Sequence, residues 1–404
     1  MENRKKLPLA TWILIALFLG IGAGLLLMKN PAFADSYIKP WGTLFLNLIK
    51  FVVVPVVLFS IAAAVVGMQD LKKVGYIGGR TVAFYLATTF LAVIIGLVVS
   101  NIFKGSYMLL ATSGLEYKAA AAPGIIDTIV NIFPSNAVEP LVKATMLQVI
   151  VMALFIGFGV ILAGERGVKA GEVIESLDII FQKIMGFIIQ LSPIGVFCLI
   201  TPVVATNGPQ VLGSLAMVLL VAYICYVLQI LLVYAPALKA MGGMSPLKFF
   251  KGLSPAMILA FSSASSVGTL PLNMDCTQRL GARKDVVSFS LPLGATINMD
   301  GTAIYQGVCT VFIAACYGIN LTLGQLLTVV LTATLASVGT AGVPGAGMIM
   351  LVMVLESVGL PVEGIALVAG VDRIFDMGRT CVNITGDSVC AIVVSKMLDR
   401  REGR

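Results

Sequence analysis

The stretch Val371–Cys390, which reads VDRIFDMGRTCVNITGDSVC, decides how the rest of the chain is interpreted. It lies within an apolar segment, residues 365–394, that is long enough to cross a bilayer as a helix. At about 100° per residue, five polar side chains fall within about 80° of one another on that helix: Asp372, Asp376, Arg379, Asn383 and Asp387. Ionisable groups at membrane depth are costly and mark functional sites by default. We therefore interpret this face as a binding site, and the alternative is a structural seam of ion pairs.

The composition is that of a polytopic membrane protein. The 404 residues are 58% hydrophobic and 12% charged, whereas soluble domains carry about 25% charged residues. The net charge of +7 does not indicate nucleic-acid binding, because the basic residues lie between hydrophobic segments, where they set orientation in the bilayer. The chain has no histidine, and its seven cysteines lack the spacing of a zinc site or a disulfide framework. We predict no cofactor.

We predict an all-α fold with eight transmembrane helices and two re-entrant helical hairpins. The uninterrupted apolar segments are 8–28, 43–67, 81–103, 144–164, 179–205, 211–237 and the final, charged span 364–396. Three further segments are interrupted by small or polar residues: 246–275 at 262–271, 286–318 at 298–301, and 322–360 at 339–347. The basic residues gather on one side of this arrangement, which predicts a multi-pass protein of the cell (inner) membrane with both termini cytoplasmic.

An internal repeat accompanies the interrupted segments. The tetrapeptide SVGT occurs at 266–269 and again at 337–340. Each copy precedes a span with asparagine and aspartate beside a glycine, at 298–301 and at 383–387. Paired interrupted helices in corresponding positions indicate a transporter site at the interface of two repeats. In the predicted topology the first hairpin enters from the cytoplasm and the second from outside, so we expect the repeats to be inverted.

Two side chains on the charged face suit an amino-acid substrate. Arg379 offers a planar fork that matches a carboxylate, and Asp376, one turn earlier, suits an ammonium group. A neutral substrate would leave Arg379 uncompensated in a low dielectric. An acidic amino acid is therefore the predicted substrate. Alternatively, Arg379 and Asp376 pair with each other at i, i+3, which is compatible with a binding role in the empty protein.

Oxygen-bearing side chains beside helix-breaking glycines predict a site for a hard cation, which prefers oxygen ligands. These side chains are Asn298, Asp300, Asn383 and Asp387, with additional hydroxyls from Tyr85, Thr88 and Thr89 in the third span. Sodium is the favoured ion. Proton transfer through Asp300 or Asp387 is the rival interpretation.

Four motifs carry a family resemblance that covers nearly the whole chain. They are SSASSVGTLP at 262–271, GATINMDGTAIYQG at 294–307, VGTAGVPGAG at 338–347 and DMGRTCVNITGD at 376–387. Together they resemble the glutamate/aspartate transporter family of sodium- or proton-coupled symporters, which includes archaeal aspartate transporters and the animal excitatory amino acid transporters. The resemblance implies sodium-coupled uptake of L-aspartate, L-glutamate or both, with no enzymatic activity.

The resemblance also implies an architecture. It predicts a homotrimer in which residues 1–77 and 111–208 of each protomer form a scaffold. Residues 78–110 and 209–404 then form a transport domain that moves across the bilayer like an elevator. The partners are an acidic amino acid, sodium ions and the lipid bilayer.

The residues that the resemblance assigns to substrate binding are Arg379, Asp376, Thr380, Asn383, Ser265, Ser266, Thr302, Val343 and Gly347. It implies a first sodium site of Gly294, Asn298, Asn383 and Asp387, and a second of Thr296, Met299, Ser337, Val338 and Thr340. A third would use Tyr85, Thr88, Thr89, Asn298 and Asp300. Archaeal aspartate transporters have an arginine where this chain has Ala264, and we hypothesise that Arg373 supplies that positive charge.

Two alternatives to sodium-coupled symport remain at this point. One is a proton-coupled glutamate/aspartate symporter. The other is an intramembrane aspartyl protease, in which Asp300 and Asp387 would act as acid and base. Protease chemistry does not call for Arg379 or for the repeated hairpins, which makes it the remote alternative.

Overall fold

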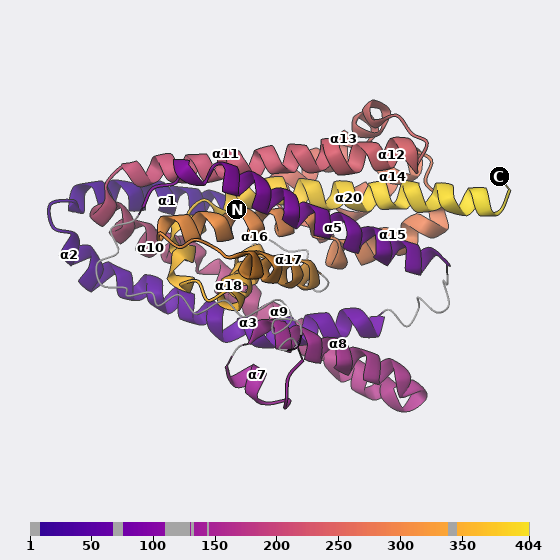
Figure 1. The fold of residues 1–404 in the computed structure, drawn as a ribbon, viewed down its shortest axis with the longest axis horizontal. Coiled ribbons are helices and arrows are strands. Elements are labelled where there is room, and N and C mark those ends of the chain that lie inside the picture. Colours follow the sequence, from indigo (N-terminus) through magenta and orange to yellow (C-terminus); the bar gives the residue numbers. More distant parts are fainter. Residues whose placement is uncertain are drawn as a thin grey trace, which may run out of the picture.

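The computed structural model describes residues 9–67, 76–109, 130, 133–143, 145–337 and 346–403. All regular secondary structure in these residues is helical (Figure 1). The predicted all-α class is confirmed for the described part of the chain.

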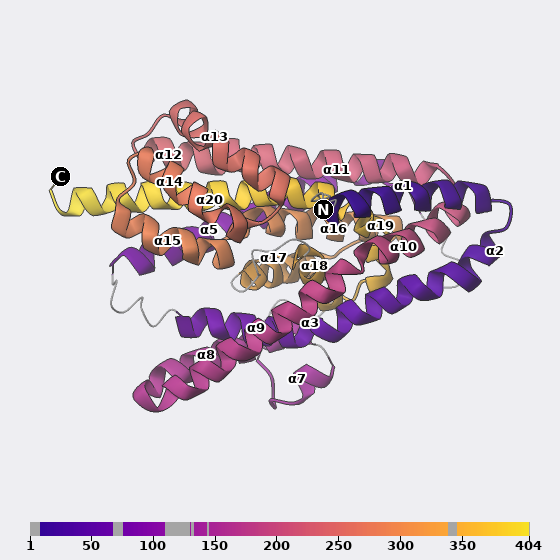
Figure 2. The ribbon, with the colours of Figure 1, turned by 180° about the vertical axis from the view of Figure 1, so that it is seen from behind.

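Most helices of the first half of the chain form one group, and the exception, Tyr76–Ile102, packs in the second group. Helix α1 (Leu9–Leu27) packs against α10 (Ser192–Asn207), while α3 (Lys39–Gly67) packs against α8 (Met146–Leu162) and α9 (Val168–Gln190). The remaining turns of this half are short: α2 (Pro31–Phe33), η1 (Ala34–Ile38), η2 (Lys104–Ser106), α7 (Glu139–Val142) and η3 (Gly164–Gly167). Figure 2 shows α8 and α9 meeting α3 at an angle in the lower part of the molecule.

The second group surrounds the charged helix α20 (Asp372–Arg401). Helix α20 contacts α5 (Tyr76–Ile102), α11 (Gln210–Gln229) and α16 (Asp300–Cys316) (Figure 1). It also contacts α13 (Pro246–Ser263), α14 (Ser266–Arg279) and α15 (Lys284–Ile297). The other elements are η4 (Ile230–Tyr234), α12 (Ala235–Ala240), α17 (Leu323–Ser337), α18 (Ala346–Ser357), η5 (Val362–Gly364) and α19 (Ile365–Ala369). The charged face is thus enclosed by protein.

Two of the three predicted interruptions are confirmed. Helix α13 ends at Ser263 and α14 begins at Ser266, with the buried Ala264 between them in the left-handed region at φ 51°. Helix α15 ends at Ile297 and α16 begins at Asp300. The third interruption falls between α17 and α18, and residues 338–345 there lie outside the described part of the chain.

By length and composition, five described helices are apolar enough to cross a membrane: Pro31–Gly67, Tyr76–Ile102, Gln210–Ala240, Lys284–Cys316 and Asp372–Arg401. The span predicted at 179–205 is instead bent by 52° between α9 and α10. Pro193 lies in the first turn of α10 and has no N–H to donate to the preceding turn, which explains the bend. Counting this bent pair as one span gives six, so eight crossings and two re-entrant hairpins stay predictions.

Candidate functional site

Arg379 lies at the centre of the charged face of α20, as predicted. Its side chain is 2% exposed. Its Nε donates to Asp376 Oδ1 at 2.8 Å, and its Nη1 donates to Asp372 Oδ1 at 3.1 Å. The guanidinium also lies over the ring of Tyr305, with 4.6 Å from Cζ to the ring centroid. The predicted pair with Asp376 is confirmed, and Asp372 is a second carboxylate partner that we did not assign to the site.

The first turn of α18 lies against the same guanidinium. A Cβ atom built on the buried Gly347 would overlap Nη1 of Arg379, so only glycine lets the backbone come this close. The first N–H groups of a helix have no partner within that helix, and they favour anions. Two groups that favour anions, the Arg379 guanidinium and the first N–H groups of α18, therefore lie side by side. The Asp376 carboxylate lies next to them and can accept hydrogen bonds. Thr380 follows Arg379 and is buried.

Arg373 connects α20 to the break between α13 and α14. Its Nη2 donates to the main-chain oxygens of Ser263 at 3.1 Å and Ser262 at 3.3 Å, and its Nη1 lies 3.9 Å from Asp376 Oδ2. These carbonyls belong to the last turn of α13, where free carbonyls attract cations. Ser265 caps α14 by accepting from the Gly268 N–H at 3.0 Å. Arg373 thus holds the break between α13 and α14 against the charged helix.

The residues of the first predicted sodium site come together. Asn298 Nδ2 donates to Asp387 Oδ1 at 2.9 Å and to the main-chain oxygen of Asn383 at 3.2 Å. A Cβ on Gly294 would overlap Asp387 Oδ1, which places this backbone directly beside the carboxylate. Asn298 Oδ1 is buried and accepts no hydrogen bond from the described residues. The cluster therefore has oxygens that suit a hard cation.

Asp300 is the centre of a second, fully buried cluster. Thr89 Oγ1 donates to Asp300 Oδ1 at 2.6 Å. Gln229 Nε2 and Tyr234 Oη donate to the other oxygen, Oδ2, at 3.0 and 2.7 Å. Three donors on one carboxylate stabilise it in the absence of a cation. Of the predicted hydroxyl partners of Asp300, the structure therefore confirms the contacts with Thr89 and Thr88.

The hydroxyl of Tyr85 has a different partner, and that of Thr88 has a second one in addition to Asp300. Tyr85 Oη donates to the main-chain oxygen of Ser290 at 2.8 Å, and Thr88 Oγ1 donates to that of Tyr85 at 3.2 Å. Tyr85 Oη nevertheless lies beside Gly294, because a Cβ there would come within 2.6 Å of it. Tyr85 thus stands next to the first predicted sodium site.

The second predicted sodium site is only partly visible. Met299 is buried and its sulfur accepts from Asn383 Nδ2 at 3.1 Å. Thr296 is exposed, and the Ser337 hydroxyl donates to the main-chain oxygen of Thr334 at 2.7 Å. No hydrogen bond within the described residues joins Met299, Thr296 and Ser337. The predicted residues Val338, Thr340 and Val343 lie outside the described residues.

Asn383 links the residues predicted to bind substrate with those predicted to bind sodium. Its Oδ1 accepts from the Gly301 N–H at 2.7 Å, and its Nδ2 donates to Thr302 Oγ1 at 3.4 Å. Ser266, at the start of α14, is buried.

We missed Gln229 and Tyr234 in the sequence, although Gln229 is the only amide or charged side chain in residues 211–237. An amide at membrane depth that lies on an otherwise apolar helix indicates a buried partner, and this signal was present.

A buried arginine–carboxylate centre, beside carboxylates on interrupted apolar helices, is typical of a membrane transporter. The model of the sodium:dicarboxylate symporter family matches residues 9–397, and the chain belongs to this family. The chain is 35% identical to the proton/sodium-glutamate symport protein of Geobacillus stearothermophilus, over 97% of this chain and 95% of that protein.

Two further relatives are named for other substrates. The proton/glutamate-aspartate symporter of Escherichia coli (strain K12) is 34% identical over 97% of this chain and 93% of its own length. The C4-dicarboxylate transport protein of Bacillus subtilis (strain 168) is 33% identical over 96% of this chain and 93% of its own length. The family and these relatives are transporters, so the protein is a multi-pass membrane symporter and not an enzyme. The protease alternative is thereby excluded.

Proposed function

We propose that this symporter takes up L-glutamate, L-aspartate or both, together with sodium ions. The observation that carries the proposal is the buried Arg379 beside Asp376. Arg379 binds the side-chain carboxylate of the substrate, and Asp376 accepts the ammonium group. A C4-dicarboxylate has no ammonium group and would leave Asp376 facing a second anion. Asp376 therefore favours an amino acid over the substrate class named for the Bacillus subtilis relative.

The choice of sodium rests on the cluster around Asp387. The unpartnered Asn298 Oδ1, the Asp387 carboxylate and the nearby Asn383 carbonyl are hard oxygen ligands. Proton coupling is the second candidate, and a specific observation favours it. Asp300 already receives three hydrogen bonds, so it needs no cation to be satisfied. Proton coupling is also named for the relatives from Geobacillus stearothermophilus and Escherichia coli.

We further propose that residues 1–77 and 111–208 form a static scaffold, and that residues 78–110 and 209–404 move as a transport domain. The packing supports this division, because α3, α8 and α9 contact one another while α5, α11, α13–α16 and α20 enclose the charged face. The working unit is proposed to be a homotrimer in the cell membrane, with both termini in the cytoplasm, where the basic residues gather.

Accumulation of radiolabelled L-glutamate and L-aspartate in proteoliposomes tests the function. We expect uptake against the amino-acid gradient when an inward sodium gradient is imposed at equal pH. Uptake driven by a pH gradient without sodium would establish the proton-coupled alternative. Accumulation of succinate in preference to both amino acids would contradict the role of Asp376.

Replacing Gly347 with alanine is expected to weaken L-glutamate binding by about tenfold. The added methyl group overlaps the guanidinium of Arg379, which cannot move freely because two carboxylates hold it, and overpacking of this kind costs about 1–3 kcal/mol. The measurement is isothermal titration of purified protein. The matched control is Gly213→Ala in α11, where an added Cβ contacts nothing within 4 Å. Equal affinities in the two variants would contradict the placement of α18 against Arg379.

Replacing Arg373 with glutamine is expected to weaken L-glutamate binding about tenfold. The change removes two charge-assisted hydrogen bonds to the tip of α13 and a positive charge near Asp376. Substrate affinity and thermal stability are measured on the same preparation, with Lys248→Gln on the exposed face of α13 as control. Unchanged affinity would show that Arg373 does not replace the positive charge absent at Ala264.

A further inference from the structure

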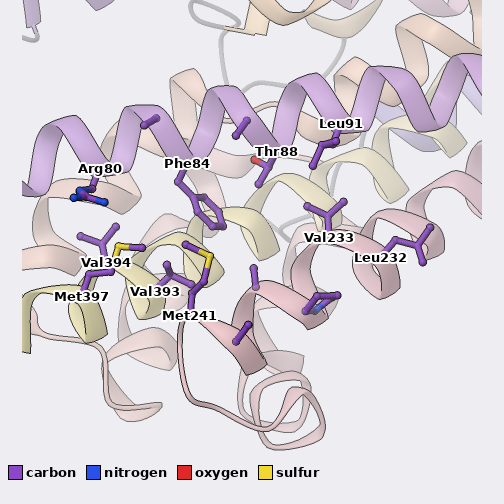
Figure 3. A pocket seen from close by; sticks show the side chains of 15 residues that line it. Arg80, Phe84, Thr88, Leu91, Leu232, Val233, Met241, Val393, Val394 and Met397 are labelled. Atoms are coloured by element: carbon purple, nitrogen blue, oxygen red, sulfur yellow. The ribbon is translucent and has the colours of Figure 1, made fainter. Parts of the chain in front are cut away.

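A groove of about 500 Å³ lies between α5, the η4–α12 segment and the last turns of α20 (Figure 3). Its lining is almost entirely apolar and includes Phe84, Leu232, Met241 and Val393. Among the described residues that line it, Arg80 is the only charged one. Figure 3 shows Arg80 at one end of the groove, on the side of Val394 and Met397, with Leu91 and Leu232 toward the other end. The groove is thus apolar along its length and basic at one end.

The groove opens on the helices that are least covered by protein. The apolar windows of Tyr76–Ile102 and Gln210–Ala240 are only 39% and 33% buried, against 83% for Asp372–Arg401. Apolar helices with so much uncovered surface face lipid in a membrane protein. Water has almost no polar partner inside such a groove, because Thr88 is the only uncharged polar side chain among the described lining residues. An acyl chain is the occupant that this environment supplies.

Two guanidinium groups mark the basic end. The Cζ atoms of Arg80 and Arg401 lie 5.0 and 4.7 Å from the centroid of the same ring, that of Tyr76. Within the described residues, no carboxylate forms an ion pair with either arginine. Two like charges on one ring repel each other, and a shared anion relieves that repulsion. A guanidinium group whose face is stacked on the Tyr76 ring still has N–H groups at its edge, and these can donate hydrogen bonds to a phosphate.

We propose that this groove binds one anionic phospholipid, with an acyl chain along Phe84 and Leu232 and the phosphate at Arg80 and Arg401. Basic pockets between transmembrane helices bind anionic headgroups. All phospholipids of the bilayer have similar acyl chains. The acyl chain therefore fills the groove but does not discriminate one lipid from another. Selection comes from the two arginines, because a phosphate with a neutral headgroup keeps its full negative charge, whereas the ammonium group of a zwitterionic headgroup offsets the phosphate and is repelled by the arginines.

Two kinds of variant test separately the binding of the acyl chain and the binding of the headgroup. Ala237→Phe places a ring in the groove from α12, and Arg80→Gln combined with Arg401→Gln removes the basic end while Tyr76 stays. Neither change touches the contacts of Asp300 or Arg379. Arg166→Gln, an exposed basic position on η3, is the matched control for the charge. Ala83→Phe fills the same groove from α5 and replaces Ala237→Phe if that variant fails to fold.

Native mass spectrometry of the purified, delipidated protein tests the proposal. It is titrated with phosphatidylglycerol and with phosphatidylethanolamine of identical acyl chains. We expect one phosphatidylglycerol to bind to the wild-type and Arg166→Gln proteins at least about tenfold more tightly than phosphatidylethanolamine. The double arginine variant is expected to bind both lipids equally, and the groove-filling variant is expected to lose this site for both.

Three outcomes would overturn the proposal. They are equal affinity of the wild-type protein for the two lipids, an unchanged preference in the double arginine variant, and unchanged phosphatidylglycerol binding in a folded groove-filling variant. Because the measurement uses no amino acid and no ion gradient, its result is independent of the proposed transport function.

Discussion

The Arg379→Lys variant is expected to bind L-glutamate and L-aspartate roughly 100-fold more weakly than the wild-type protein, a loss of about 2.7 kcal/mol. Lysine keeps the positive charge between Asp372 and Asp376, so the local charge balance survives. It lacks the planar fork with which Arg379 donates at the same time to both carboxylates. A lysine engaged with the two aspartates has no second, parallel N–H for a substrate carboxylate. The measurement is substrate binding by isothermal titration.

A control and a second substitution make this test specific. Arg279→Lys on α14 is the matched control, because Arg279 is exposed and pairs with Asp275 at i, i+4. It should leave affinity unchanged. Arg379→Cys should lose acidic substrates, and it is the variant in which binding of neutral amino acids such as L-serine is sought. Wild-type affinity for aspartate in either Arg379 variant would show that this arginine does not hold the substrate carboxylate.

The Asp387→Asn variant is expected to abolish the strengthening of L-glutamate binding by sodium. In the wild-type protein, coupling of the usual size changes the substrate Kd about 5–150-fold between sodium-free and saturating conditions. Asp387 is buried against Gly294 and accepts from Asn298, so an amide there keeps the shape of the cluster but removes its negative charge. A cation then loses its main electrostatic partner. Substrate affinity is titrated against sodium at fixed pH.

A second titration, against pH without sodium, separates the two coupling ions. If protons drive transport, wild-type affinity rises as the pH falls and ignores sodium, and Asp387→Asn mimics the protonated state. The matched control is Asp275→Asn, which changes an exposed carboxylate of α14. A full sodium response in the Asp387→Asn protein would remove Asp387 from the ligands of the coupling ion.

The charged face of α20 was predictable because it depends on helical periodicity alone. Asp376 and Arg379 are one turn apart, and a pair at that spacing forms in almost any regular helix. The break at Ala264 was also predictable, since serines and glycine interrupt an apolar segment there. Asp372 was placed on the correct face but not in the site. Its bond to Arg379 spans seven residues and requires the arginine side chain to extend toward the start of the helix.

What could not be predicted depends on how distant helices meet. Gln229 and Tyr234 reach Asp300 from a helix that lies about 70 residues earlier in the chain. Hydropathy places each of these residues in a membrane span, but it does not show which faces of two spans pack against each other. The bend between α9 and α10 was missed for another reason. Residues 179–205 were predicted as one uninterrupted span from their apolar composition, although Pro193 removes a main-chain donor at the junction.

The two carboxylates around Arg379 also bear on the part of the cycle in which nothing is carried. A symporter that has delivered its cargo has to return unladen. An arginine whose only partner was the substrate would then be an unpaired charge in a low dielectric, and this would add a large free-energy barrier to the return step. Asp372 and Asp376 already occupy its N–H groups when cargo is absent. Arg373 lies 3.9 Å from Asp376, so the two arginines and the two aspartates have no net charge together, and we expect the unladen protein to reset without a counter-ion at this point.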